Sequence, residues 1–591
     1  MKKATSTASQ LSNIATDAIL ARQLVAERAR LEQEFGITKI PVQHFRRPEE
    51  RNFTAEERGH VTILFGGLTG KHERLIKAVF EGSGYRCQPL PAPNLSAFHL
   101  GKEFGNTGQC NPAYFTVGAL IRYLRQLETQ GLSRQEIVDN YVFFTSGTCG
   151  PCRFGMYESE YRLALKNAGF DGFRVLLFSQ NDGITAKSGE PGLKFTVDFG
   201  MGALNAINLG DVTHEMLYQI RPYEIVPGET NRVFAELLEN LAKFLQDRRR
   251  FEILEWLPES LSRRVAPKTK LKNTLNTLGK IYQHLYGKDY IRMLHQCRER
   301  MAQIEVDRLR VKPIVKITGE FWAQTTEGDG NFNMFAFLER EGAHVLVDSI
   351  ANWLMYLLHQ AKANALNRKG LDVPYFEPAW YEFRKTLMNE VRFRKKWLLL
   401  SLGERVFFHQ YHRVAAGLGN VAHPLVPQAE LARLAHPFYH SLARGGEGHQ
   451  EVGKNVYYTA NHLCHMVLAL KPFGCMPSSQ SDGVQSAVMN QFPEMIFLPI
   501  ETAGEGEINA HSRVQMALGE ARSKAKLEFE CVLDSTGKQL DEIEAFVAGH
   551  PQLRNPLYQV PHRRDVAGVA ANFALHVNDL MNGKAALPRA G

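Results

Sequence analysis

Short apolar runs that end in glycine or polar turns recur along this chain and alternate with helix-like patterns. In the first part of the sequence each run has the length of a buried strand. The runs lie at residues 61–65, 141–145 and 173–178, with helix-like patterns at residues 73–81, 113–128 and 156–168. Strands that alternate with helices pair in parallel, because a parallel connection needs a crossover segment. The sequence therefore predicts an α/β fold with a doubly wound parallel sheet.

The same plan returns in the second half. Strand-like runs lie at residues 313–317, 344–347 and 495–500, and a long helical insert, about residues 351–470, separates the last run from the others. Residues 212–310 read as mostly helical and charged. Two strand–turn–helix halves suggest two related α/β domains that face each other.

The 591 residues are too many for a single hydrophobic core. We expect an N-terminal helix and linker, a first α/β domain, a helical connector, a second α/β domain with its insert, and a C-terminal helical segment. Amphipathic patterns at residues 11–35 and 566–581 predict the first and last helices. The corresponding boundaries are residues 1–58, 59–211, 212–310, 311–515 and 516–591.

Composition limits the cellular location and the binding partners that we expect for this protein. The net charge of +8 is spread along the chain, without an aromatic-interleaved basic motif, so we expect no nucleic-acid partner. No apolar run approaches the roughly 20 residues that cross a membrane, and no apolar segment of a signal peptide follows Met1. We therefore expect a cytoplasmic protein that does not bind membranes. Its eight cysteines should be reduced, metal-bound or catalytic rather than paired in disulfides.

Cys149 and Cys152 form a C-x-x-C motif directly after the strand predicted at residues 141–145. Open α/β sheets bind ligands at the carboxyl ends of their strands. Gly147 and Gly150 allow the backbone to approach a bulky group, and Pro151 fixes the turn. The motif alone fits three interpretations: a redox dithiol, two ligands of a metal or cluster, or two structural cysteines.

Two further cysteines occupy similar turns. Cys110 and Cys475 both lie among glycine and proline residues, where thiolates can converge and backbone amides can donate to cluster sulfurs. A redox dithiol needs no third or fourth cysteine, so Cys110, Cys149, Cys152 and Cys475 are the candidate ligands of one site. The residue types separate zinc from iron poorly. We expect the remaining cysteines to be small buried side chains: Cys87, Cys297, Cys464 and Cys531.

Other polar features are weaker. The turn from Gly66 to Lys71 resembles a P-loop, but only three residues separate Gly66 from Gly70, and a histidine rather than a serine or threonine follows the lysine. We therefore expect no ATP hydrolysis. The turn could still hold an anion at a helix N-terminus. Glu320, Ser146 and Ser478 follow predicted strands or cysteine turns and are candidates for the substrate side of a site. The spaced histidine pairs suit a metal less well than ordinary packing: His409 with His412, and His462 with His465.

Together these motifs resemble the iron–sulfur component family of 2-hydroxyacyl-CoA dehydratases and benzoyl-CoA reductases. The likeness is greatest to the C-terminal part of large activase-related proteins. Its most specific parts are the Gly-Pro-Cys-Arg turn around Cys152 and the Phe-Gly-Cys-Met-Pro turn around Cys475. The resemblance runs from about residue 50 to 525 and rests on residues 65–73, 108–112, 147–157, 318–335, 446–455 and 471–516.

The resemblance implies facing flavodoxin-like domains with a [4Fe–4S] cluster held in the cleft between them. A separate ATP-hydrolysing activase of the sugar-kinase/actin-like fold would dock and deliver one electron at low potential, because this chain resembles only the part behind the ATPase domains. The electron would drive a reduction or a dehydration on a CoA thioester. The alternative is a non-enzymatic zinc or iron–sulfur scaffold that binds a partner ATPase. The substrate, the choice between reduction and dehydration, the cluster type (single cubane, double cubane or zinc) and the oligomeric state stay open.

Overall fold

The computed structural model describes residues 23–35, 50–147, 152–179, 192–248, 251–266, 269–369, 383–443 and 446–587. The chain divides into two compact units, Met1–Pro48 and Glu49–Gly591. In the first unit residues 23–34 are helical, as the pattern at residues 11–35 predicts, and residues 11–22 lie outside the described residues. Everything below concerns the second unit.

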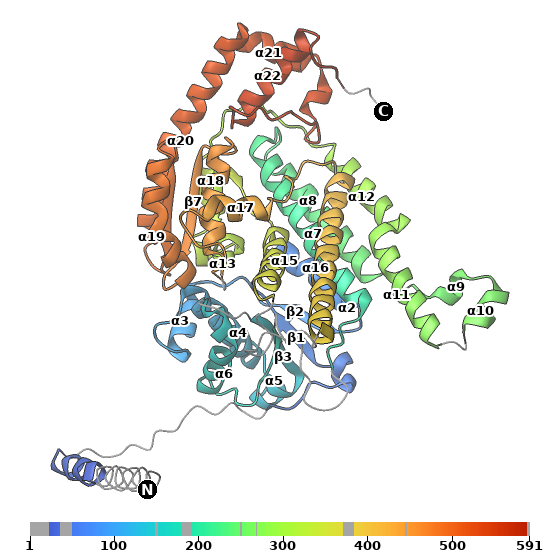
Figure 1. Cartoon of the computed structure of the whole chain (residues 1–591). Helices are drawn as coiled ribbons and strands as arrows, with labels where there is room; N and C mark the ends of the chain where they lie inside the picture. The colour runs from blue at the N-terminus through green and yellow to red at the C-terminus, as the bar shows by residue number, and fades with distance from the viewer. Residues whose placement is uncertain are drawn as a thin grey trace. The chain divides into compact units, whose positions relative to one another are not determined.

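Two four-stranded sheets, all of whose strands run parallel, organise the second unit (Figure 1). The strand order is β2-β1-β3-β4 in the first sheet and β6-β5-β7-β8 in the second. The prediction of an α/β fold with parallel sheets is confirmed. The strands are β1 (Thr62–Phe65), β2 (Arg86–Pro89), β3 (Tyr141–Gly147), β4 (Arg174–Ser179), β5 (Ile314–Gly319), β6 (His344–Leu346), β7 (Met466–Pro472) and β8 (Phe497–Thr502).

Helices cover both faces of the first sheet. In β1, Ile63 packs into a core shared with α2 (Gly70–Gly82) and α7 (Val197–Ile220), while the adjacent Leu64 packs against α4 (Asn111–Thr129) and α6 (Tyr157–Asn167). Burial on both faces explains why this strand reads as an unbroken apolar run rather than an alternating one. The remaining helices of this region are α3 (Leu95–Phe104), α5 (Arg134–Asn140) and the 3-10 turn η2 (Arg153–Met156).

The helices of the predicted connector pack against the first sheet. Residues of its helices share the core that contains Ile63, and α16 (Phe383–Gly417) of the insert joins the same core. Helix α7 runs through the boundary expected between residues 211 and 212. The other connector helices are α8 (Glu229–Gln246), α9 (Ile253–Trp256), α10 (Glu259–Val265), α11 (Thr269–Tyr286) and α12 (Lys288–Met301).

The second sheet is also enclosed on both sides. Val315 and Leu468 pack against α14 and α20, whereas Ile314 and Val467 pack against α17 and α18. The C-terminal end of α20 packs with α21 and α22 in a small separate core (Figure 1). These helices are α13 (Phe321–Thr325), α14 (Met334–Arg340), α15 (Ile350–Asn367), α17 (Gln428–Ala435), α18 (Gly448–Ala460), α19 (Met476–Gln491), α20 (Glu507–Thr536), α21 (Leu540–Ala548) and α22 (Val569–Met581).

Strand β7 is absent from the sequence-based prediction, which places its first residues inside the helical insert at residues 351–470. This part of the prediction is wrong. All seven residues of β7 are buried, between β5 and β8. A short, continuously apolar run of this kind cannot be distinguished from a buried helical segment by periodicity.

A buried ion cluster joins β5 to the helices beside it. The ammonium group of Lys316 is fully buried, donates to the carbonyl of Val347 at 2.9 Å and lies 3.6 Å from the carboxylate of Asp348. Lys454 of α18 pairs with the same carboxylate. Burial alone would raise the pKa of Asp348, but the charges of Lys454 and Lys316 outweigh it and lower the pKa from 3.8 to about 2.

We expect Asp348→Asn to lower the free energy of unfolding by about 3–5 kcal/mol, because it leaves two buried ammonium groups without their carboxylate. Urea unfolding at pH 7 measures the loss. In the parent the contribution of Asp348 should be complete above about pH 4 and disappear as the pH falls toward 2, since its pKa is lowered on folding. Asp289→Asn, at an exposed position on α12, is the control and should change stability by less than about 0.5 kcal/mol.

Candidate functional site

The carboxyl ends of the two sheets meet. The backbone N–H of Asn111, at the start of α4, donates to the carbonyl of Phe473 at 3.1 Å, and its side-chain amide donates to the carbonyl of Thr502. Phe473 follows β7 and Thr502 ends β8. A third contact joins the N–H of Leu95, at the start of α3, to the carboxylate of Asp329 at 2.9 Å. Parallel sheets bind ligands at this edge, so the cleft is the candidate site.

Three of the four predicted cysteine ligands lie in this cleft, each at the N-cap of a helix. Cys110 precedes α4, Cys152 precedes η2 and Cys475 precedes α19. Proline in the first turn begins both α4 and α19, where its missing N–H costs no hydrogen bond. The three segments are far apart in the sequence and reach the cleft from both sheets.

Two glycines let the cysteine segments approach each other. A Cβ at Gly474 would stand 3.3 Å from the Cα of Cys110, and a Cβ at Gly446 would stand 3.7 Å from the Cβ of Cys152 while colliding with Pro477. Both glycines have positive φ angles, +76° and +91°. Any other residue would be strained there, so these positions keep the cysteine turns close.

The other predicted site residues differ in how close they lie to the three cysteines. Cys149 lies outside the described residues. Glu320 caps α13 and accepts from the N–H of Ala323 at 2.9 Å, and Ser478 is buried in the first turn of α19, beside Cys475. Ser146 is exposed near the end of β3, and no contact within the described residues joins it to the three thiols.

The cleft disfavours negative charge on its thiols. Burial raises the pKa of Cys110, Cys152 and Cys475, and the charge of Glu320 raises each of them further. The hydroxyl of Tyr157 lies 3.0 Å from the sulfur of Cys110 and lowers the pKa of that thiol. Without a bound cation the three thiols are therefore protonated at neutral pH.

Glu447 is a site residue that the sequence analysis does not single out. Its carboxylate accepts from the N–H of Phe321, next to Glu320. Burial and the charge of Glu320 raise the pKa of Glu447 to about 8, and burial raises that of Glu320 to about 7. The sequence points to Glu447 only through the polar, glycine-rich run at residues 446–455. Its hydrogen bond to Phe321 joins residues 126 positions apart, so no local pattern reveals it.

The donor chemistry of the cleft fits a thiophilic metal or cluster. Three thiols are the ligand type that iron–sulfur clusters and zinc prefer, and a bound cation would offset the cost of ionising buried thiols. Among the side chains that the structure describes, no group of three or more His, Cys, Asp and Glu is already arranged around a metal-ion position.

The turn after β1 binds one of the chain's own carboxyl groups. The hydroxyl of Thr69 caps α2, and the N–H of Leu68 donates to the carboxyl of Glu73 at 3.1 Å. Burial raises the pKa of Glu73 to about 8, so at neutral pH the group that the turn holds is mostly a neutral acid. The turn from Gly66 to Lys71 therefore uses the amide of Leu68 internally rather than presenting it to a phosphate.

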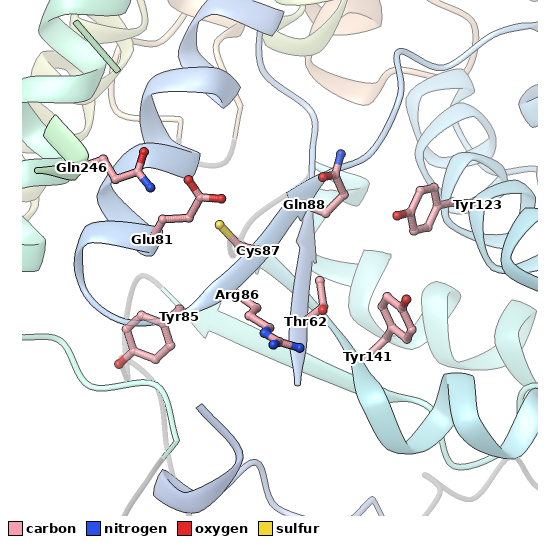
Figure 2. A pocket seen from close by; sticks show the side chains of 9 residues that line it. All are labelled: Thr62, Glu81, Tyr85, Arg86, Cys87, Gln88, Tyr123, Tyr141 and Gln246. Atoms are coloured by element: carbon pink, nitrogen blue, oxygen red, sulfur yellow. The ribbon is translucent and has the colours of Figure 1, made fainter. Parts of the chain in front are cut away.

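A shallow cavity of about 480 Å³ opens at the opposite edge of the first sheet, near the starts of its strands (Figure 2). Its thiol, Cys87, is buried, and burial raises the pKa of that thiol to about 12. A thiol of that pKa is a poor nucleophile, in agreement with the structural role expected for it. Cys297 and Cys464 are also buried, but Cys531 is exposed on α20, so the expectation for it is wrong.

The spaced histidines do not form a metal site within the described residues. His409 and His412 lie on α16, but His462 and His465 do not share a helix. His462 lies in the turn after α18, with a φ angle of +48°. The ring of His465 accepts from the N–H of Ile314 at 2.9 Å and lies 3.2 Å from the carboxylate of Glu528. These contacts make it a structural link between β5 and α20.

Comparison with protein-family models finds none that matches this chain, and comparison with curated proteins finds no match either. None of the helices within the described ranges has the length and apolar character needed to cross a membrane. The arguments that follow therefore rest on the residues of the cleft.

Among the described cysteines of the metal-free native protein, we expect iodoacetamide to alkylate Cys531 first, since the buried Cys110 and Cys475 and the partly buried Cys152 have raised pKa values and little thiolate. Peptide mass spectrometry over time at pH 7 measures the order. Urea should abolish the difference by exposing every thiol. Fast labelling of Cys475 in the folded protein would contradict the burial described here.

Proposed function

We propose that the chain is the iron–sulfur component of an ATP-coupled low-potential reductase or 2-hydroxyacyl-CoA dehydratase-like system. The observation that carries the proposal is the convergence of Cys110, Cys152 and Cys475, from three distant segments, at the carboxyl ends of both sheets. A structural thiol needs no such convergence. A redox dithiol of Cys149 and Cys152 leaves the other two cysteines unexplained.

The finer fold assignment belongs to the same proposal. Both sheets have the order 2-1-3-4 when their strands are numbered from the start of each half, which corresponds to part of the flavodoxin-like order. In that arrangement a ligand binds beyond the carboxyl end of the central strands. We propose two flavodoxin-like domains with their binding edges turned toward each other.

The proposed ligands of a [4Fe–4S] cluster are Cys110, Cys149, Cys152 and Cys475. Such a cluster supplies a one-electron carrier whose potential depends on nearby hydrogen bonds and burial. The backbone amides of Ala113 and Ser478, which donate toward the thiols of Cys110 and Cys475, would supply such hydrogen bonds. Glu320 and Glu447, with raised pKa values, lie where a substrate proton could be accepted or donated.

The electron would come from a separate ATP-hydrolysing activase of the sugar-kinase/actin-like fold, and the substrate would be a CoA thioester. Support for the separate ATPase is the turn from Gly66 to Lys71, which has neither Walker spacing nor the hydroxyl that binds magnesium. The family resemblance alone supports the CoA thioester.

Serine variants test the ligand set. We expect Cys110→Ser and Cys475→Ser each to lose most of the iron and the absorbance near about 400 nm after anaerobic reconstitution with iron and sulfide, because serine is a poor cluster ligand. Iron, sulfide and zinc are measured together. Cys531→Ser, at the exposed position, is the matched control and should keep the parent's iron content.

The outcomes separate the alternatives. If both variants keep the parent's iron and spectrum, the four-cysteine site is wrong. If the parent takes up zinc but no iron, the non-enzymatic scaffold replaces the electron-transfer role.

We expect the purified chain alone to release no phosphate from ATP above background, because the amide of Leu68 binds Glu73 and Lys71 pairs with Glu327 at 3.2 Å rather than standing free for a phosphate. A malachite-green assay with Mg²⁺ measures the release. Lys71→Ala is the control for contaminating activity and should leave the background unchanged. Robust hydrolysis that Lys71→Ala abolishes would show that this turn binds ATP.

A further inference from the structure

Arg153 completes the Gly-Pro-Cys-Arg turn but is not one of the proposed ligands. It directly follows Cys152 and is the first residue of η2. Its guanidinium nitrogen Nη1 donates to the backbone carbonyl of Gly108, which lies two residues before Cys110. This hydrogen bond joins the turn of Cys152 to the turn of Cys110, although Arg153 and Gly108 are 45 positions apart in the sequence.

The same nitrogen lies beside the third cysteine turn. A Cβ at Gly474 would stand 3.6 Å from Nη1 of Arg153 and 3.3 Å from the Cα of Cys110. Gly474 directly precedes Cys475, which belongs to the second sheet. One guanidinium group therefore lies next to the turns of Cys110, Cys152 and Cys475, which reach the cleft from both sheets.

The positive charge of Arg153 also acts on the thiols. Burial has the largest effect on Cys110 and raises the pKa of its thiol, whereas the charge of Arg153 lowers that pKa. The pKa of Cys475 is raised by burial and then by the negative charges of Glu320 and Glu447. Among the described residues no carboxylate forms an ion pair with Arg153. Its charge is therefore available to offset the negative charges of the cleft.

We propose that Arg153 is a positioning residue of the cysteine site, which holds the three cysteine turns together and places a positive charge beside them. The inference rests on the proposed iron–sulfur function. Reduction adds one negative charge to a cluster, and a nearby cation stabilises the added charge. Arg153 should therefore make the reduction potential of the site less negative. The competing role for an arginine at the rim is to bind an acidic partner, which would leave the cysteine turns unaffected.

Two variants of the full chain separate the contact from the charge. Arg153→Met removes both, whereas Arg153→Lys keeps a charged donor. The metal-free proteins are treated at mildly alkaline pH with dibromobimane, which becomes fluorescent when it joins two thiols, and peptide mass spectrometry identifies the pair. We expect the parent to form a product between Cys110 and Cys475. Arg153→Met should form about 3- to 10-fold less, because it lacks one hydrogen bond from a charged donor, and Arg153→Lys should recover most of the yield.

Anaerobic reconstitution with iron and sulfide tests the effect of the charge. We expect Arg153→Met to hold less iron than the parent. The fraction that does assemble should have a more negative reduction potential, measured by redox titration with EPR detection. Arg153→Lys should keep the potential of the parent. Arg392→Met, at an exposed position on α16, is the matched control and should leave the cross-linking, the iron content and the potential unchanged.

Three results would overturn the proposal. The first is a parent protein that forms no product between Cys110 and Cys475. The second is an unchanged cross-linking yield in Arg153→Met, which would leave the contact with an acidic partner as the role of this side chain. The third is a lower iron content in Arg153→Met with an unchanged potential, which would show that the charge has no effect on the site.

Failure of the proposed function gives a different result. If the parent takes up neither iron nor zinc, the iron–sulfur proposal is wrong. The cross-linking of the metal-free protein then still decides whether Arg153 holds the cysteine turns together, because it needs no bound metal.

Discussion

The hydrogen bond from the backbone N–H of Asn111 to the carbonyl of Phe473 is the contact on which the site depends. Asn111 directly follows Cys110, and Phe473 precedes Cys475 by two residues, so one backbone bond fixes the spacing of two cysteine turns from different sheets. The side-chain amide of Asn111 adds a second bond to Thr502. Because Asn111 is buried, breaking these bonds would leave polar groups without water to replace their partners.

The two halves use equivalent strands for equivalent purposes. β3 and β7 hold the same place in their sheets, and the chain leaves each of them into a cysteine turn, with Cys152 and Cys475 respectively. β1 and β5 are also equivalent, and each leads into a helix that begins with an acid of raised pKa: Glu73 lies in the first turn of α2, and Glu320 is the N-cap of α13. Because the carboxyl ends of the two sheets face each other, the thiols lie in one part of the cleft and the protonatable acids lie in its walls.

Several strands and the cysteine turns could be predicted, because they depend on local sequence patterns. β1 and β3 are apolar runs bounded by glycine turns, and cysteines beside glycine and proline indicate sharp turns at strand ends. β7 could not be recognised, since its apolar run fits a buried helix equally well and only its pairing with β5 and β8 makes it a strand. Glu447 also escaped prediction, because its role depends on the N–H of Phe321, a contact that exists only after the second sheet has formed. Local patterns indicate strands and turns, whereas buried polar partners follow from tertiary contacts.

Burial gives the cleft its chemical character. The same exclusion of water raises the pKa values of the cysteine thiols and of Glu320 and Glu447, so these groups are held in their neutral forms more firmly than in water. A metal or cluster that binds thiolates must then displace protons from Cys110 and Cys475, and the displaced protons can be taken up only by nearby groups or by solvent. Two carboxyls poised near neutrality are such acceptors. If these thiols bind a cluster as proposed, its binding is therefore linked to the protonation of Glu320 and Glu447.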